Sequence, residues 1–143
     1  MPAESTPPAA WLLKTEPGAY SFDDLAREGT AVWDGVTNPV ALRNLRAMRE
    51  GDRAVIYHTG KEKAAVGWAR VARAAYADPR AREPGRTVVD LAAGPRLARP
   101  VTLARLKADA AFAGSPLVRQ GRLSVVPLTA RQLRRLEELG RET

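Results

Sequence analysis

The stretch of residues 52–76, DRAVIYHTGKEKAAVGWARVARAAY, predicts two neighbouring β-strands joined by a turn. Residues 52–59 place apolar side chains on both faces of the expected strand, which is typical of a strand that lies inside a sheet. Residues 63–76 are also apolar on both faces around Gly67-Trp68, and Gly60 marks the turn between the two runs. We expect this antiparallel hairpin to form the centre of the fold.

Four shorter strands are expected around this hairpin. They are runs rich in apolar and β-branched residues, at 11–15, 87–91, 96–101 and 123–126. Gly94-Pro95 is expected to interrupt the sheet between the second and third runs, and Pro127 to end the last one. Residues 77–86 are rich in proline and charge and predict a loop.

Capping signals predict four helices. Ser21-Phe22-Asp23-Asp24 has the spacing of a capping box, and Gly29 ends the short helix that follows. Asn38-Pro39 supplies an N-cap and a first-turn proline for a helix that Gly51 closes. Another short helix is expected at 102–109, and Thr129 with Gln132 forms a capping box for the last. Short strands mixed with helices, without regular alternation, indicate an α+β domain around a twisted or closed sheet.

The length of 143 residues fits one domain with one core. Residues 1–9 are mostly Pro, Ala, Ser and Thr and predict a disordered lead, so the domain is expected at residues 10–143. No run approaches the roughly 20 apolar residues of a membrane-spanning helix, and the start of the chain lacks the features of a signal peptide. We therefore expect a monomeric, cytoplasmic protein without a membrane partner.

The composition excludes several kinds of site. The chain has no cysteine and one histidine, His58, so neither a thiolate site nor an ordinary zinc site can be built. Glycine-rich cofactor and phosphate-binding motifs and a nucleophile elbow are missing as well, so we expect no cofactor, no metal and no catalytic residue. A hydrolase that uses His58 as its base is an alternative, although one histidine at a strand end is more typical of a structural residue or a ligand hydrogen-bond donor.

The charge balance favours an anionic partner. Lys+Arg 23 against Asp+Glu 16 gives a net charge of +7, and 19 of the 23 cations are arginine. The planar guanidinium suits phosphates and base edges, so nucleic acid is the expected partner. An arginine- and alanine-rich composition is equally expected from a GC-rich genome, and charge alone does not separate the two explanations.

Aromatic side chains are concentrated in the first half of the chain. Seven of the eight, all except Phe112, fall within residues 1–76. A base flipped out of a nucleic acid is held by stacking on its face and by hydrogen bonds on its edge, and this half could supply both. Trp33 is the best stacking candidate, because Asp34-Gly35 follows it in a stretch that indicates a turn. The other rings are expected to lie in the core.

Polar residues of the same half each have a second explanation. Lys14 is the first lysine of the chain and lies in an otherwise apolar strand, so its ammonium must reach solvent, an acid or an anionic ligand. Ser21 and Asn38 are explained as helix caps, although the Asn38 side chain could also reach a base edge. Arg43 and Arg46 occur three residues apart on the expected central helix and either follow a phosphate backbone or form a solvated face.

An ordered set of motifs resembles one known family. No single motif is specific, but together they span residues 11–128 and resemble the EVE domain family of the PUA-like superfamily. The motifs are Trp11-Leu12-Leu13-Lys14-Thr15-Glu16-Pro17, Tyr20-Ser21-Phe22-Asp23-Asp24-Leu25, Trp33-Asp34-Gly35-Val36 with Asn38, Leu45-Arg46-Ala47-Met48, Gly51-Asp52, Tyr57-His58, and Arg119-Gln120 with Arg122-Leu123-Ser124-Val125. The chain departs from the family pattern at Thr37, where the family commonly has arginine, at Leu42-Arg43 and at Thr59.

The resemblance implies a PUA-like β-barrel with flanking helices and a pocket for a flipped modified base. The implied ligand is a modified cytosine in DNA, of the 5-methylcytosine or 5-hydroxymethylcytosine type. By position, the residues implied to line the base pocket are Trp33, Lys14, Ser21, Asn38, His58, Thr59 and Gln120. The resemblance implies that Arg119 contacts the nucleic-acid backbone, beside Arg43 and Arg46, for which the spacing on the central helix indicates the same role. Such a reader could serve restriction or defence in a bacterium.

One alternative remains open beside the hydrolase. A PUA-like RNA-binding module that acts on tRNA or rRNA would use the same charge and the same barrel. The sequence favours modified DNA over RNA as the partner only through the resemblance.

Overall fold

The computed structural model describes residues 7–141 of the chain. The expected disordered lead at 1–9 therefore lies mostly outside the described residues. Near its end, the backbone N–H of Ala9 donates to the carbonyl of Leu128, 2.8 Å away, just before the first strand begins. No helix within residues 7–141 is long and apolar enough to cross a membrane.

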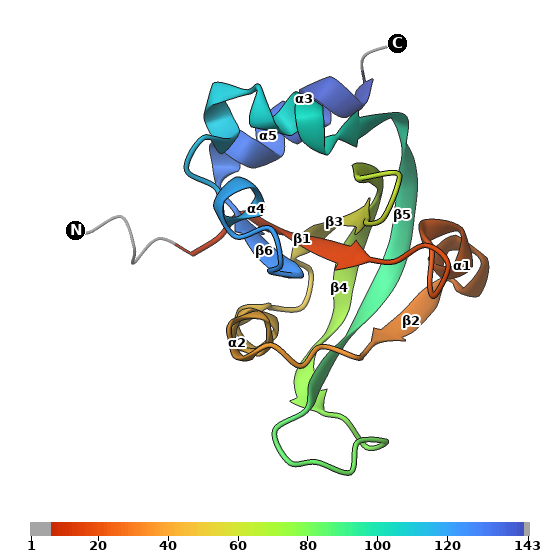
Figure 1. Ribbon diagram of the computed structural model, residues 1–143. Helices are drawn as coiled ribbons and strands as arrows, with labels where there is room; N and C mark the ends of the chain where they lie inside the picture. The colour runs from red at the N-terminus through yellow and green to blue at the C-terminus, as the bar shows by residue number, and fades with distance from the viewer. Residues whose placement is uncertain (1–6, 142–143) are drawn as a thin grey trace.

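Six strands form one sheet in the order β2-β5-β4-β3-β1-β6 (Figure 1). Their bounds are β1 Ala10–Thr15, β2 Thr30–Trp33, β3 Arg53–His58, β4 Ala64–Ala77, β5 Thr87–Thr102 and β6 Val125–Leu128. β1 and β3 are parallel, which the long crossover between them permits, and the other neighbours are antiparallel. The expected α+β class is confirmed. Over residues 7–141 the edge strands β2 and β6 do not pair, so the sheet is open, and the closed barrel implied by the resemblance is wrong on this point.

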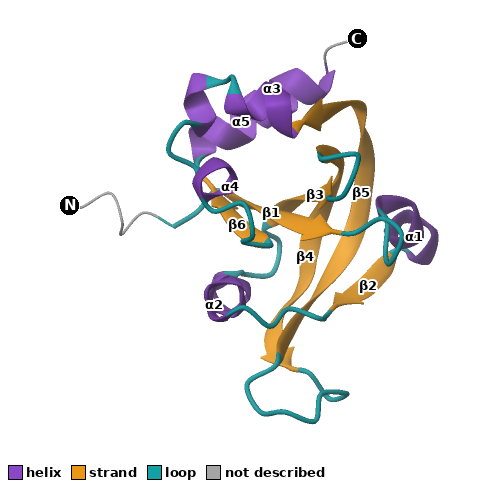
Figure 2. Ribbon diagram, in the orientation of Figure 1, coloured by secondary structure: helices purple, strands orange, loops and turns teal. Residues whose placement is uncertain are grey.

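The helices cover the sheet from several sides (Figure 2). They are α1 Phe22–Glu28, α2 Pro39–Ala47, α3 Leu103–Lys107, the 3₁₀ helix η2 Ala110–Phe112, α4 Pro116–Arg119 and α5 Ala130–Arg141. α2 packs against β4, β5 and β6, α1 against β2 and β5, and α5 against β5, β6 and η2. The core contains fully buried side chains from most of these elements, among them Trp11, Phe22, Leu45, Ile56 and Phe112.

The expected caps are confirmed atom by atom. The Ser21 hydroxyl accepts from the N–H of Asp24 at 3.1 Å, and the Asp24 carboxylate accepts from the N–H of Ser21 at 2.9 Å. Thr129 and Gln132 exchange the same pair of bonds at the start of α5. These bonds satisfy backbone donors that the first turn of a helix leaves unpaired. The capping residues of these helices could therefore be predicted from the sequence.

Two expectations about proline were wrong. β5 continues through Gly94-Pro95, where the pairing with β4 passes from Ala69↔Ala93 to Gly67↔Arg96 and so inserts an extra residue in β5. A bulge of this kind accommodates proline without ending the strand. Pro127 likewise lies within β6, because β6 is an edge strand in which one row of N–H groups is not needed for pairing.

The turn expected from Asp34-Gly35 falls in an irregular segment, residues 34–38, in which Gly35 has a positive φ of 78°. Trp33 is the last residue of β2, a strand that the sequence analysis missed, and pairs with Val89 of β5. β2 has only four residues and a mostly exposed pattern, so its apolar periodicity is too short to be recognised. The short elements η2 and α4 were missed for the same reason.

Candidate functional site

The open sheet leaves a cavity of about 810 Å³ between its two edges. β2 and the loop that follows it line one side, whereas the end of β1 and the segment before β6 line the other. The third contribution comes from Arg80, in the loop that joins β4 to β5 and projects beyond the body of the protein (Figure 1). The cavity falls within the range of about 300 to 1,000 Å³ that is typical of small-molecule sites.

Two aromatic rings meet at one wall of this cavity. Trp33 lines it from the end of β2, although the residue is only 7% exposed and also packs in the core. The Tyr20 ring stands edge-on to the Trp33 ring, with centroids 6.1 Å apart and an interplanar angle of 82°. Tyr20 was counted among the aromatic residues of the first half but was not predicted as part of the site. Both aromatic side chains line the cavity at this wall.

A carboxylate lies beside the phenol. The Tyr20 hydroxyl donates a short hydrogen bond to Glu28, the last residue of α1, and both residues line the cavity. Burial raises the pKa of Tyr20 well above its ordinary value, and the hydrogen bond to Glu28 and the charge of Glu28 raise it further. Tyr20 therefore stays protonated and serves Glu28 as a permanent donor.

Cations line the opposite side of the cavity. The Lys14 ammonium donates to the carbonyl of Gly121 at 2.9 Å and lies 5.7 Å from the centre of the Tyr57 ring. Burial lowers the pKa of Lys14, because a partly desolvated ammonium is less stable than a hydrated one. Arg122 lies on this side as well, whereas Arg80 reaches the cavity from the β4–β5 loop. The cavity therefore has a basic side that faces an acidic, aromatic one.

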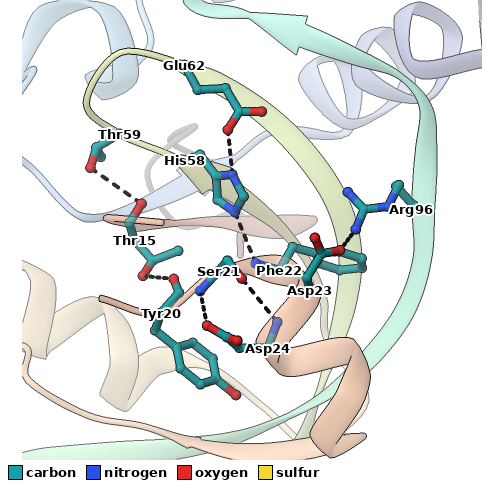
Figure 3. A network of polar contacts seen from close by, with 10 residues as sticks. All are labelled: Thr15, Tyr20, Ser21, Phe22, Asp23, Asp24, His58, Thr59, Glu62 and Arg96. Atoms are coloured by element: carbon teal, nitrogen blue, oxygen red, sulfur yellow. Dashed lines mark hydrogen bonds and ion pairs between the residues drawn. The ribbon is translucent and has the colours of Figure 1, made fainter. Parts of the chain in front are cut away.

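His58 lies outside the cavity, at the end of β3, and its side chain is hydrogen-bonded to the first residue of α1 (Figure 3). Its Nε2 accepts from the backbone N–H of Phe22 at 3.0 Å, and its Nδ1 lies 2.8 Å from the Glu62 carboxylate. Because Nε2 accepts, the ring proton is on Nδ1 and is donated to Glu62. The residue is 7% exposed, and both of its nitrogens are already engaged.

Neighbouring polar residues hold the wall that carries Tyr20. The Thr15 hydroxyl donates to the carbonyl of Tyr20 at 2.6 Å, and the Thr59 hydroxyl donates to the carbonyl of Thr15 at 3.4 Å (Figure 3). The backbone N–H of Thr59 donates to the same carbonyl at 2.9 Å. Ser21 caps α1 directly after Tyr20. Ser21 and Thr59 do not line the cavity, so what the structure shows for them is positioning of the residues that do.

Asn38 lines the cavity and also caps α2. Its side-chain oxygen accepts from the N–H groups of Val40 and Ala41 at 2.9 and 3.1 Å. The amide NH₂ is the part of this side chain left for a ligand. Thr37, which stands where the resemblance suggests arginine, lines the cavity as well, and Arg80 and Arg122 provide guanidinium groups there instead.

The residues expected to contact a nucleic-acid backbone lie at the surface outside the cavity. The Arg46 guanidinium donates to the carbonyl of Gly85 at 2.9 Å and so connects α2 with the β4–β5 loop. Arg43 is exposed on the same helix. Arg119 donates to the carbonyl of Ala113 at 3.2 Å, and Gln120 is the exposed C-cap of α4.

The structure thus brings together three of the seven base-pocket residues expected from the sequence, namely Trp33, Lys14 and Asn38. Ser21, His58, Thr59 and Gln120 lie elsewhere, and a direct role for them stays a prediction. Sequence reasoning missed Tyr20, Glu28, Arg80 and Arg122 as residues of the site. Arg122 lies within a quoted motif, but no sequence signal indicates that the loop at 77–86 would return Arg80 to the cavity.

Comparison with known proteins gives consistent matches. The family model for the EVE domain matches residues 9–139. Thymocyte nuclear protein 1 of Mus musculus is 38% identical over 80 residues, which cover 48% of this chain and 35% of the mouse protein. The chain therefore matches about a third of that relative.

Two solved structures resemble nearly the whole chain. The NMR structure of Rpa0253 from Rhodopseudomonas palustris has 40% identity and a TM-score of 0.86, with 92% of each chain covered. The crystal structure of human THYN1 in complex with 5-methylcytosine-containing DNA has 30% identity and a TM-score of 0.82, and covers 94% of this chain and 98% of that chain. In that crystal structure, THYN1 is bound to DNA that contains the modified base.

Proposed function

The chain belongs to the EVE domain family, and we propose that it binds DNA and captures one flipped-out modified cytosine in the cavity between its sheet edges. The observation that carries this proposal is the pairing of Trp33 and Tyr20 at one wall of a cavity whose other wall is basic. A flipped base requires an aromatic face and a few polar groups at its edge. The complex of human THYN1 with 5-methylcytosine-containing DNA supports the choice of ligand.

The polar groups of the cavity fit the edge of a cytosine ring. Cytosine presents two ring-side acceptors and one amino donor, so it needs both donors and acceptors from the protein. Lys14 and the Asn38 amide are donors, and Glu28 is an acceptor. A modified carbon needs room, which an open cavity of about 810 Å³ supplies.

The nucleic-acid backbone is proposed to lie across the mouth of the cavity. Arg80 and Arg122 line it from two different segments, and Arg43 is exposed on α2, the helix that Arg46 connects to the Arg80 loop. Guanidinium groups placed in this way hold phosphates without reading the sequence. All of these residues belong to one chain, so a single copy is proposed to be sufficient for binding.

We propose binding without chemistry. The alternative hydrolase would need His58 as its base, yet the Nε2 atom is used by the Phe22 N–H and the Nδ1 proton by Glu62. A general base must reach the proton it removes, and these two contacts hold the ring outside the cavity. The arrangement favours a structural role for His58.

A binding screen tests the proposal. Matched DNA and RNA oligonucleotides with cytosine, 5-methylcytosine or 5-hydroxymethylcytosine at one position are titrated with the protein at two salt concentrations. Selective binding of one modified cytosine in DNA, with a preference that persists at the higher salt concentration, is expected, since phosphate contacts alone give salt-sensitive and unselective affinity. Equal affinity for all bases contradicts the proposal, and selective binding of RNA alone supports the RNA-binding alternative.

A further inference from the structure

The two sides of the cavity carry opposite charge, and this asymmetry constrains the ligand. Glu28 lies on the side of α1 and β2, whereas Lys14 lies on β1, near the other edge of the open sheet. A base that bridges these sides must offer a hydrogen-bond donor to the carboxylate and an acceptor to the ammonium. 5-Methylcytosine and thymine carry the same 5-methyl group but differ in this respect, because cytosine has an amino group where thymine has a carbonyl.

Glu28 is an exposed residue at the end of α1, on the wall of the cavity. A carboxylate at the C-terminus of a helix lies near the negative end of the helix dipole, which is unfavourable. Arg27, the adjacent cation, is paired with Asp24 instead. The Oε1 atom of Glu28 accepts a hydrogen bond from the Tyr20 hydroxyl, so the carboxylate is held at the aromatic wall.

The Glu28 carboxylate can accept more hydrogen bonds than the one that Tyr20 donates to it. An ionised carboxylate offers about four acceptor positions on its two oxygens, of which the Tyr20 hydroxyl takes one. The backbone of Tyr20 is itself held by the Thr15 hydroxyl and by the carbonyl of Glu16, so the acceptor is oriented before a ligand arrives. Orienting an acceptor in advance lowers the cost of binding.

We propose that the Glu28 carboxylate, oriented by Tyr20, accepts a hydrogen bond from the exocyclic amino group of the captured base and selects cytosine-type over thymine-type bases. This assignment rests on the proposed function of the cavity. It makes Glu28 a specificity-determining residue and Tyr20 a positioning residue.

The test compares single-stranded DNA oligonucleotides that carry 5-methylcytosine or thymine at one position. The two bases share the methyl group and the ring, and single strands remove any difference in the cost of opening a base pair. In the Glu28→Gln variant the amide oxygen can still accept from Tyr20, which turns the NH₂ donor towards the ligand. The preference for 5-methylcytosine over thymine is expected to fall by about tenfold or more, because hydrogen bonds to charged groups contribute about 1.5 to 3 kcal/mol.

Two further variants complete the experiment. Glu50→Gln removes an exposed carboxylate outside the cavity and is expected to leave the preference unchanged. Tyr20→Phe retains the ring but not the hydroxyl and is expected to lower the preference partly, because Glu28 loses the group that orients it. If Glu28 had only a structural role, its substitution would change stability and overall affinity, but not the ratio of the affinities for the two bases.

The outcomes separate this inference from the proposed function. If the wild-type protein discriminates between modified bases and Glu28→Gln, folded as judged by its melting temperature, keeps the full preference, the assignment of Glu28 is overturned and the cavity proposal stands. If the wild-type protein shows no base preference at all, both proposals fail.

Discussion

The Nε2 atom of His58 lies 3.0 Å from the backbone nitrogen of Phe22 and accepts its hydrogen bond. This bond satisfies a buried donor in the first turn of α1 that would otherwise have no partner. His58→Ala is therefore expected to lower the free energy of unfolding by about 1 to 3 kcal/mol, the range for an unsatisfied buried group. Denaturant titration measures the loss.

Lys61→Ala, an exposed substitution in the same hairpin, is the control and should leave stability unchanged. The base preference of folded His58→Ala is expected to persist, since the ring does not line the cavity. Reproducible turnover of a nucleic-acid or ester substrate that His58→Ala abolishes would contradict the binding-only function.

Local chemistry accounts for what the sequence could predict. The caps at Ser21 and Thr129 and the hairpin around Gly60 depend on residues a few positions apart, and all of them are present in the structure. The bulge at Gly94-Pro95 depends on the pairing partner instead. Proline has the same sequence signal whether it ends a strand or occupies a bulge, so the register of β4 and β5 had to be seen.

The cavity depends on contacts between residues that lie still further apart in the sequence. Arg80 reaches it from a loop whose composition indicates only a loop, and the Arg46 to Gly85 hydrogen bond that holds this loop joins residues 39 positions apart. Glu28 could be recognised only as an acid at the end of a helix. The sequence and the family resemblance both indicated Trp33, Lys14 and Asn38, but neither could give their distances or the residues opposite them.

Arg43 and Arg46 are expected to differ in their effects. Arg43→Ala should weaken binding to all DNA sequences alike and reduce the slope of log affinity against log salt by about 0.7 to 0.9, the value for one lost phosphate contact. Arg46→Ala should also free the loop that carries Arg80, because it removes the bond to Gly85. Its effect on affinity is therefore expected to exceed that of Arg43→Ala.

Titrations at several salt concentrations measure both effects. Arg134→Ala, exposed on α5 and outside the cavity, is the matched control. Unchanged affinity and slope for both α2 variants would show that these arginines form only a solvated face.

Gly67 fixes the approach of α1 to the sheet. A Cβ atom at this position would lie 2.2 Å from one atom and 2.4 Å from two others of the buried Phe22 ring. Gly67→Ala is expected to cost about 1 to 3 kcal/mol of stability, the range for overpacking in a core. Gly114→Ala, where the added atom would meet nothing within 4 Å, is the control. Equal melting temperatures for the two variants would contradict the close packing of Phe22 on Gly67.

The lowered pKa of Lys14 predicts that binding depends on pH. Its pKa lies below 10.5 because of burial, so the ammonium loses its proton at a lower pH than an exposed lysine does. The affinity advantage of the wild-type protein over Lys14→Met should therefore decrease as the pH rises through this lowered pKa. Comparing the two proteins on one oligonucleotide cancels titration of the DNA. Lys61→Met should behave as wild type, and an advantage that does not change with pH would argue against a charged contact from Lys14.

Trp33 provides the most demanding prediction, because the residue belongs to both the cavity and the core. Trp33→Ala is expected to weaken binding by about 1 to 3 kcal/mol through lost stacking. It is also expected to cost about 3 to 5 kcal/mol of stability, since the side chain is 7% exposed and packs in the core. Affinity must therefore be measured well below the melting temperature of the variant.

Two matched variants separate stacking from unfolding. Trp33→Phe keeps an aromatic face and should recover a large part of the affinity while remaining less stable than wild type. Trp68→Ala removes a half-buried tryptophan that lies under the Arg53 guanidinium, 4.6 Å from its ring centre and outside the cavity. It should lower stability without changing base preference, because the Trp68 ring does not line the proposed base cavity. If folded Trp33→Ala kept full affinity and selectivity, Trp33 would be a core residue only, and the base would have to stack on Tyr20 instead.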